Sequence, residues 1–142
     1  MVEISRAQAY SRTRQDHASE TTEDYVEAIA DIIRNKDCCR AVDLSKQLGV
    51  SHVTVSKALA RLADDGFVDS EPYRPIQLTQ QGKLLAAKVK RRHEIVYRFL
   101  LCLGVDDKTA MVDSEGIEHH VSQKTLSKMK EFLDSSDLPL DR

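Results

Sequence analysis

The chain has 142 residues, 41% of them hydrophobic, and a formal net charge of −2. This length suits one or two small domains with a buried core and is short for an elaborate enzyme. No apolar run approaches the roughly 18 residues that a membrane span requires, and the first residues are polar where a secretory signal is apolar. We therefore expect a cytoplasmic protein with no membrane partner.

Charge is distributed unevenly along the chain. Residues 1–35 carry four Lys and Arg against seven Asp and Glu, residues 36–92 carry eleven against six, and residues 93–142 carry six against ten. A negative total is not typical of a nucleic-acid-binding protein. The positive charge is confined to the middle of the chain, where a local DNA-binding surface would need it.

The first predicted helix covers about 22–35. Thr21 to Asp24 offer capping residues, and apolar side chains follow at helical spacing, at Tyr25, Ile29, Ile32 and Ile33. The polar segment before this helix is compatible with either a helical extension or a disordered arm. We treat residues 1–21 as an N-terminal extension.

Two short helices are predicted next, separated by a tight turn. The first covers 41–48 and ends at Gly49, a residue that tolerates positive φ. Ser51 caps the second, whose expected core residues recur at i, i+4 and i+7: Val55, Leu59 and Leu62. This arrangement predicts a helix-turn-helix, with an ordinary helical hairpin as the alternative.

A short hairpin is predicted to follow the helix-turn-helix. Phe67-Val68 begins an extended stretch, Pro72 and Pro75 bracket a turn, and residues 76–79 alternate like a returning strand. A two-stranded hairpin is marginal alone and must pack on the helices. We therefore predict a winged helix-turn-helix domain over residues 22–80.

The second half of the chain is predicted to be entirely helical. A long helix covers about 80–103 and ends at Gly104, and two helices follow at 106–119 and 122–134, the last capped by Ser122. Its apolar surface exceeds what one small unit hides, so we expect a homodimer. The predicted fold is mainly α, with residues 81–142 forming a metal-binding and dimerisation domain.

The three cysteines, Cys38, Cys39 and Cys102, form no CxxC pair and leave an odd one over. Neither a disulfide framework nor a thiolate zinc site is indicated. We expect these thiols to be reduced and structural.

A metal-ligand pattern lies near the end of the fifth predicted helix. Glu115, Glu118 and His119 stand at i, i+3 and i+4, so two carboxylates and an imidazole share one helix face. This spacing predicts a metal site. Asp24 and Glu27 form a weaker i, i+3 pair, for which a solvated face is the alternative. Taken alone, His93 is compatible with a surface or core histidine, and we expect His120 to lie beside the ligands or to be structural.

Several motifs resemble those of the diphtheria toxin repressor family, in its manganese transport regulator branch. The resemblance extends from about Thr22 to Leu133 and rests on four blocks: Glu23-Asp24-Tyr25-Val26-Glu27, Ser51 to Lys57, Arg92-His93-Glu94, and Leu103-Gly104-Val105 leading to Glu115-Gly116-Ile117-Glu118-His119-His120. The last block is highly specific to that family.

The resemblance implies a binuclear manganese site with six ligands: Asp24, Glu27, His93, Glu115, Glu118 and His119. All six residues are present. The oxygen-rich donor set agrees with the preference of Mn²⁺ for hard ligands, with Fe²⁺, Zn²⁺, Co²⁺ or Cd²⁺ as possible substitutes. The family further implies a manganese-activated regulator that represses metal-uptake genes and binds palindromic DNA as a homodimer.

The residues expected to face double-stranded DNA lie in the third helix and the wing. They are Ser51, Val53, Thr54, Ser56 and Lys57, with Arg61 and Arg74 on phosphates. We expect no enzyme activity, no catalytic residue and no organic cofactor. The alternatives are a di-metal enzyme, although the second ExxH repeat of four-helix di-iron enzymes is absent, and a regulator that answers a small organic ligand or oxidation.

Overall fold

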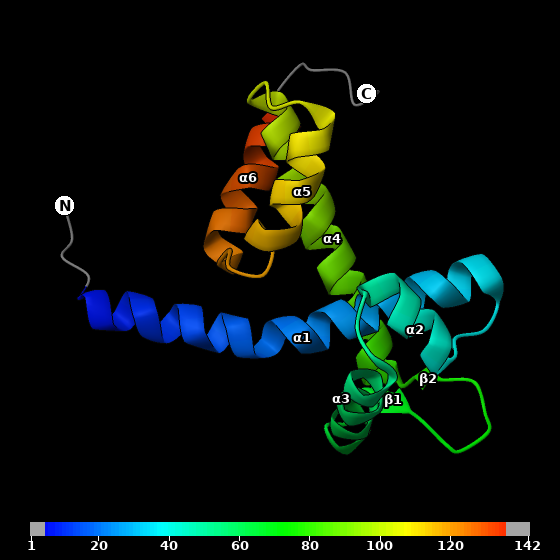
Figure 1. Cartoon of the computed structure of the whole chain (residues 1–142). Coiled ribbons are helices and arrows are strands. Elements are labelled where there is room, and N and C mark those ends of the chain that lie inside the picture. Colours follow the sequence, from blue (N-terminus) through cyan, green and yellow to red (C-terminus); the bar gives the residue numbers. More distant parts are fainter. Residues whose placement is uncertain (1–4, 136–142) are drawn as a thin grey trace. The chain divides into compact units, whose positions relative to one another are not determined.

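The computed structural model describes residues 5–135, apart from the side chain of Ala18, and this part of the chain is mainly helical (Figure 1). The outermost parts of the predicted domains, residues 1–4 and 136–142, lie outside the described residues. No helix in the described range is long and apolar enough to cross a membrane. The elements in chain order are α1 (Arg6–Lys36), α2 (Ala41–Leu48), α3 (His52–Asp64), β1 (Val68–Asp69), β2 (Gln77–Leu78), α4 (Gln80–Cys102), α5 (Asp107–Ile117) and α6 (Gln123–Ser135).

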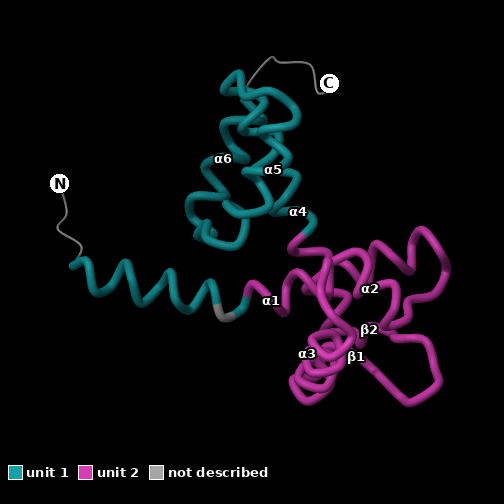
Figure 2. Tube along the Cα trace, in the orientation of Figure 1, with its two compact units in different colours: residues 1–19, 90–142 teal, residues 20–89 magenta. Residues whose placement is uncertain are grey.

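The described residues divide into two compact units (Figure 2). Unit 1 combines the residues up to Ser19 with those from Lys90 onward, and unit 2 spans Glu20–Val89. Both α1 and α4 therefore contribute to each unit. Because α1 begins at Arg6, the segment before the predicted first helix is a helical extension rather than an irregular arm.

Unit 2 is built around one apolar core. Val55, Leu59 and Leu62 of α3 are buried, as their spacing predicted. They belong to a cluster that also includes residues of α1, α2, the two strands and the start of α4, among them Val26, Ile29, Leu44, Val68 and Leu78. Burying each large aliphatic side chain contributes roughly 1.5–3 kcal/mol. The core therefore holds α3 against the rest of the unit and leaves its opposite face exposed.

The turn between α2 and α3 has the local chemistry that the sequence indicated. Gly49 adopts φ +67°, in the left-handed region that favours glycine, and ends α2. Ser51 caps α3 by accepting a hydrogen bond from the Thr54 backbone N–H at 3.2 Å. At the start of α2, the Asp43 carboxylate accepts a hydrogen bond from the Arg40 backbone N–H at 3.0 Å, which lowers the pKa of Asp43. Together these contacts set the beginning of both helices.

The predicted wing is present as a short antiparallel hairpin. Val68 of β1 pairs with Leu78 of β2, and Cys39 forms an isolated bridge with Ile76. Close packing joins the hairpin to α4, because a Cβ added to Gly82 would lie 2.1 Å from the carbonyl oxygen of Phe67. Only glycine fits at that position without a shift of the backbone.

In unit 1, helices α4, α5 and α6 are joined by capped turns. Gly104 adopts φ +93° after α4, and Asp106 caps α5 by accepting a hydrogen bond from the Thr109 N–H at 3.0 Å. Hydrogen bonds from the Thr109 side chain and, second, from this N–H lower the pKa of Asp106. Ser122 caps α6 as predicted. Between α4 and α6, Phe99 and Phe132 pack edge to face with ring centroids 5.4 Å apart. These contacts position the end of α5 beside α4.

Candidate metal centre and DNA-reading surface

Three of the predicted metal ligands meet in unit 1. His93 comes from α4, Glu115 from the last turn of α5, and Glu118 from the residue that ends α5. One ligand atom of each lies within 4.8 Å of the others. His93 Nδ1 is 3.0 Å from Glu118 Oε2 and 3.5 Å from Glu115 Oε1. The structure therefore brings the His93 imidazole together with two carboxylates that lie more than 20 residues further along the chain.

The Glu118 carboxylate is the most informative group of this cluster, because it is fully buried. Oε2 contacts His93, whereas Oε1 has no hydrogen-bond partner among the described residues and lies 3.5 Å from His119 Nε2. Burying a carboxylate is costly unless charge or hydrogen bonds compensate it. The buried oxygen and its neighbouring imidazoles therefore fit a divalent cation.

The local backbone explains why Glu115, Glu118 and His119 can act together. α5 ends at Ile117, yet Glu118 keeps helical dihedral angles, and its N–H donates to the carbonyl oxygen of Ser114 at 3.0 Å. The helical repeat therefore continues through Glu118. His119 is also buried, with 4% of its surface exposed, whereas the Glu115 side chain is 54% exposed. The cluster is thus shielded from solvent at Glu118 and His119 and accessible to solvent at Glu115.

Contacts between α4 and α5 orient His93. Its ring is stacked parallel to that of Tyr97, with centroids 6.2 Å apart, and the Tyr97 hydroxyl donates a hydrogen bond to Asp107 at the start of α5. This hydrogen bond is the main reason that the pKa of Tyr97 is raised. Tyr97 therefore links His93 to the start of α5, the helix whose other end positions Glu115 and Glu118.

The remaining two predicted ligands belong to unit 2. Asp24 and Glu27 lie one turn apart on α1, on either side of the buried residues Tyr25 and Val26. Both carboxylates are partly buried. Four predicted ligands thus lie in unit 1 and two in unit 2.

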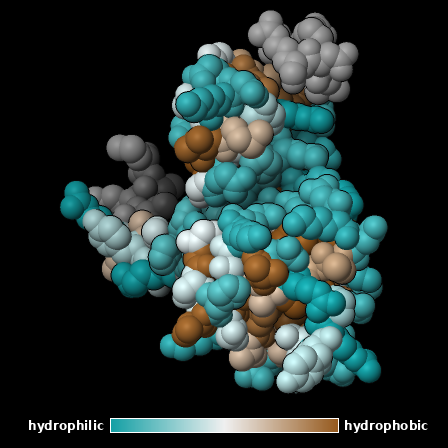
Figure 3. Space-filling model, turned by 45° about the vertical axis from the view of Figure 1, so that its right-hand side comes forward, coloured by the Kyte–Doolittle hydropathy of each residue, from teal (hydrophilic) through white to brown (hydrophobic). Residues whose placement is uncertain are grey.

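The predicted DNA-binding residues all lie on the surface of unit 2. The seven are exposed: Ser51, Val53, Thr54, Ser56, Lys57, Arg61 and Arg74. Val53 is 63% exposed although it is apolar. Figure 3 shows apolar side chains scattered among hydrophilic ones on the face of the molecule that it draws. The face of α3 that bears these residues is thus opposite its core face.

The wing tip adds an exposed residue that was not among the predicted DNA-binding residues. Tyr73 is fully exposed and adopts φ +66°, which is uncommon for a bulky side chain. Together with Ser56 of α3 and Arg74, it lines a surface pocket of about 410 Å³. The wing and α3 therefore form one continuous surface. The only sequence signal was the turn between Pro72 and Pro75 without a glycine.

Two family profiles together match most of the chain. "Iron dependent repressor, N-terminal DNA binding domain" matches residues 17–76, and "Iron dependent repressor, metal binding and dimerisation domain" matches residues 79–137. The chain belongs to this family, the diphtheria toxin repressor family. It is a metal-responsive, DNA-binding transcription regulator with a dimerisation domain.

Similarity to individual proteins confirms the manganese-regulator branch. The transcriptional regulator MntR of Escherichia coli O157:H7 is 43% identical over 130 residues, which cover 92% of this chain and 84% of the relative. The HTH-type transcriptional regulator MntR of Bacillus subtilis (strain 168) is 34% identical over 111 residues, covering 78% of each chain.

Solved structures agree with the fold. A manganese-dependent transcriptional repressor in complex with manganese has a TM-score of 0.73 and 28% identity, and the match covers 80% of this chain and 53% of that one. The manganese regulator SloR, at 23% identity, has a TM-score of 0.71. This chain spans about half the length of these two solved chains.

Proposed function

We propose that this chain is a manganese-activated repressor of metal-uptake genes that binds palindromic DNA as a homodimer. The observation that carries the proposal is the buried Glu118 carboxylate, which faces His93 and His119 at the end of α5. A buried anion of this kind is stabilised by a bound cation. Membership in a repressor family gives that cation a regulatory meaning.

Six residues would hold a binuclear site: Asp24, Glu27, His93, Glu115, Glu118 and His119. Four carboxylates and two imidazoles suit Mn²⁺, which prefers oxygen ligands, while Fe²⁺, Zn²⁺, Co²⁺ and Cd²⁺ are the expected competitors. Bound divalent cations would offset the repulsion among the four carboxylates. The relatives named for manganese regulation support this preference.

Ligands from both units provide the switch in this proposal. Asp24 and Glu27 lie in unit 2 with α3, the helix proposed to read the DNA (the reading helix), and the other four ligands lie in unit 1. With all six engaged, the orientation of unit 2 relative to unit 1 is restricted. In a homodimer the two reading helices must reach major grooves about 34 Å apart, so restricting their orientation selects the DNA-competent state.

Exposed residues of unit 2 would make the DNA contacts. Polar side chains of α3, from Ser51 to Lys57, face base edges, while Arg61 and Arg74 face phosphates. Exposed apolar residues of unit 1 support the homodimer, including Leu103, Met111 and Val112. A protein that acts on chromosomal DNA in this way works in the bacterial cytoplasm.

A DNA mobility-shift titration tests the proposal, with the promoter of a metal transporter as probe and with or without Mn²⁺. We expect a shift that requires Mn²⁺ and saturates with a dimer on each site. Equal binding with and without Mn²⁺ contradicts the switch. Membership in a regulator family favours this function over the di-metal enzyme.

A further inference from the structure

The loop between β1 and β2 projects from the helices of unit 2 and closes in a β-turn at its tip (Figure 1). The Arg74 N–H donates a hydrogen bond to the carbonyl oxygen of Glu71 at 3.2 Å. Pro72 occupies the second position of this turn, and Tyr73 at the third position has φ +66°. Proline followed by positive φ is the geometry of a type II turn, whose third position favours glycine or asparagine. This chain has a tyrosine there instead.

Tyr73 gains nothing from packing in this position. It is fully exposed, so its ring buries no surface that would offset the unfavourable backbone conformation. A bulky residue with positive φ is a genuine outlier, and such outliers persist where the surrounding structure holds them, often at functional sites. The tyrosine therefore does not stabilise the fold, and its position points to a contact outside the chain.

The rest of the wing holds this conformation in place. Glu71 pairs with Arg74 across the turn at 3.2 Å. The Ile76 N–H donates a hydrogen bond to the carbonyl oxygen of Cys39 at 2.8 Å, which ties the returning arm of the loop to the segment before α2. The tip is thus preorganised, and a partner that binds it does not have to order the loop.

The wing tip and the reading helix belong to one surface. Tyr73 and Arg74 line the same open hollow of about 410 Å³ as Ser56 and Ala60 of α3. In B-DNA a major groove about 12 Å wide is bordered by the sugar–phosphate backbone, and beyond that by a minor groove about 6 Å wide. With α3 in a major groove, a tip beside that helix reaches the bordering backbone.

We propose that Tyr73 binds the operator at the sugar–phosphate backbone beside the major groove that α3 enters. Its ring packs on a deoxyribose, and its hydroxyl donates a hydrogen bond to a phosphate oxygen. Every base pair presents these groups, so the contact adds affinity and fixes the position of the protein without reading sequence. The inference rests on the proposed DNA contacts of unit 2 and adds to them a contact without charge.

Charge separates the role of Tyr73 from that of Arg74. A cation on a phosphate releases counterions, so losing the Arg74 contact reduces the slope of log affinity against log salt by about 1. The tyrosine hydroxyl is neutral and releases none. Removing Tyr73 is therefore expected to lower affinity by the same factor at every salt concentration.

Mobility-shift titrations of the full-length protein with Mn²⁺ test the proposal, at several salt concentrations, on a metal-transporter promoter and on an unrelated duplex. We expect Tyr73→Ala to weaken binding to both DNAs about tenfold with an unchanged salt slope, and Tyr73→Phe, which loses only the hydroxyl, to weaken it about threefold. Tyr73→Gly should unfold at a higher urea concentration than wild type, because glycine removes the strain, and yet bind DNA as weakly as Tyr73→Ala.

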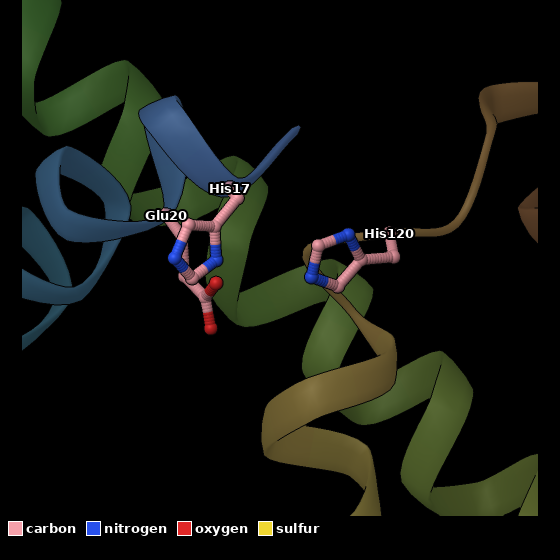
Figure 4. A group of neighbouring side chains, drawn as sticks. All are labelled: His17, Glu20 and His120. Carbon is pink, nitrogen blue, oxygen red and sulfur yellow. The ribbon is translucent and has the colours of Figure 1, made fainter. Parts of the chain in front are cut away.

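Tyr10→Ala is the matched control. Tyr10 is 58% exposed and lies on α1 in unit 1, on the same helix as His17, whose ring Figure 4 draws. We expect this variant to bind both DNAs as wild type does, and an equal loss in Tyr10→Ala overturns the proposal.

Three further outcomes contradict the proposal in different ways. If Arg74→Ala weakens binding and Tyr73→Ala does not, the contact by Tyr73 is absent while the proposed reading surface stands. If neither variant weakens binding, the wing does not touch DNA, and that part of the proposed function fails as well. A loss in Tyr73→Ala confined to the promoter would mean that Tyr73 reads bases and not the backbone.

Discussion

The two units place their functional side chains in opposite environments. On the reading surface of unit 2, the predicted DNA-binding residues are exposed, and the core lies behind them. In unit 1, Glu118 and His119 are buried, and one Glu118 oxygen has no hydrogen-bond partner among the described residues. The comparison indicates that unit 2 presents its DNA-binding residues without a ligand, whereas the buried Glu118 carboxylate in unit 1, which His93 contacts at one oxygen only, is fully compensated when a cation binds.

The sharpest test of this contrast is Glu118→Gln, which keeps the shape of the side chain and removes its charge. We expect Mn²⁺-dependent DNA binding to weaken by about 100-fold or more. The metal-free variant should be at least as stable as wild type, because no carboxylate is then buried. Mobility shifts and urea unfolding measure the two effects. Glu131→Gln, in an exposed pair with Lys128, is the control, and an intact Mn²⁺ response in Glu118→Gln contradicts the site.

Replacing a glycine with alanine is expected to change the free energy of unfolding in opposite directions in the two units. Gly82→Ala places a Cβ 2.1 Å from the Phe67 carbonyl oxygen, whereas a Cβ at Gly116 in α5 meets nothing within 4 Å. We expect Gly82→Ala to lower the free energy of unfolding by about 2 kcal/mol. Gly116→Ala should raise it by up to about 1 kcal/mol, since alanine favours a helix. Urea denaturation of both variants measures the difference, and equal values would show that the wing does not pack closely on α4.

A substitution on the exposed surface should leave metal binding intact. Lys57→Ala is expected to weaken operator binding by about 5–10-fold and to reduce the slope of log affinity against log salt by about 1, because one phosphate contact is lost. Calorimetry with Mn²⁺ should give the wild-type affinity. Lys124→Ala, exposed on α6 in unit 1, is the matched control. If Lys57→Ala lost metal affinity and DNA affinity equally, the two functions would not be separate.

The smallest expected effect concerns the thiols of unit 2. Burial raises the pKa of Cys39 to about 11, so at pH 8 very little of it is thiolate, whereas Cys38 is exposed. Alkylation with iodoacetamide at pH 8 should modify Cys38 well before Cys39, and urea should remove the difference. Peptide mass spectrometry follows each site. Rapid modification of Cys39 in the folded protein would mean that the β-bridge between Cys39 and Ile76 opens easily.

Much of the local structure was predictable because it depends on neighbours in the chain. Gly49 ends α2 at a turn because its backbone tolerates positive φ, and Ser51 caps α3 because its hydroxyl accepts a backbone hydrogen bond. Val55 and Leu59 share the core face because of the helical repeat. The sequence does not decide the conformation of the extension before residue 22, since a polar, exposed helix carries no hydrophobic period. Tyr73 was not foreseen, because its left-handed conformation depends on how the whole wing closes.

The sequence alone determined the order of the helices, the turn and caps of the reading motif, the family, and the helix face shared by Glu115, Glu118 and His119. Only the tertiary structure decided that Glu118 is buried against His93, that Phe67 leaves no room for a side chain at residue 82, and that Tyr73 is fully exposed at the wing tip. The reason is physical. Helical spacing and capping act within a few residues, whereas burial and charge pairing depend on segments that folding brings together from distant parts of the chain.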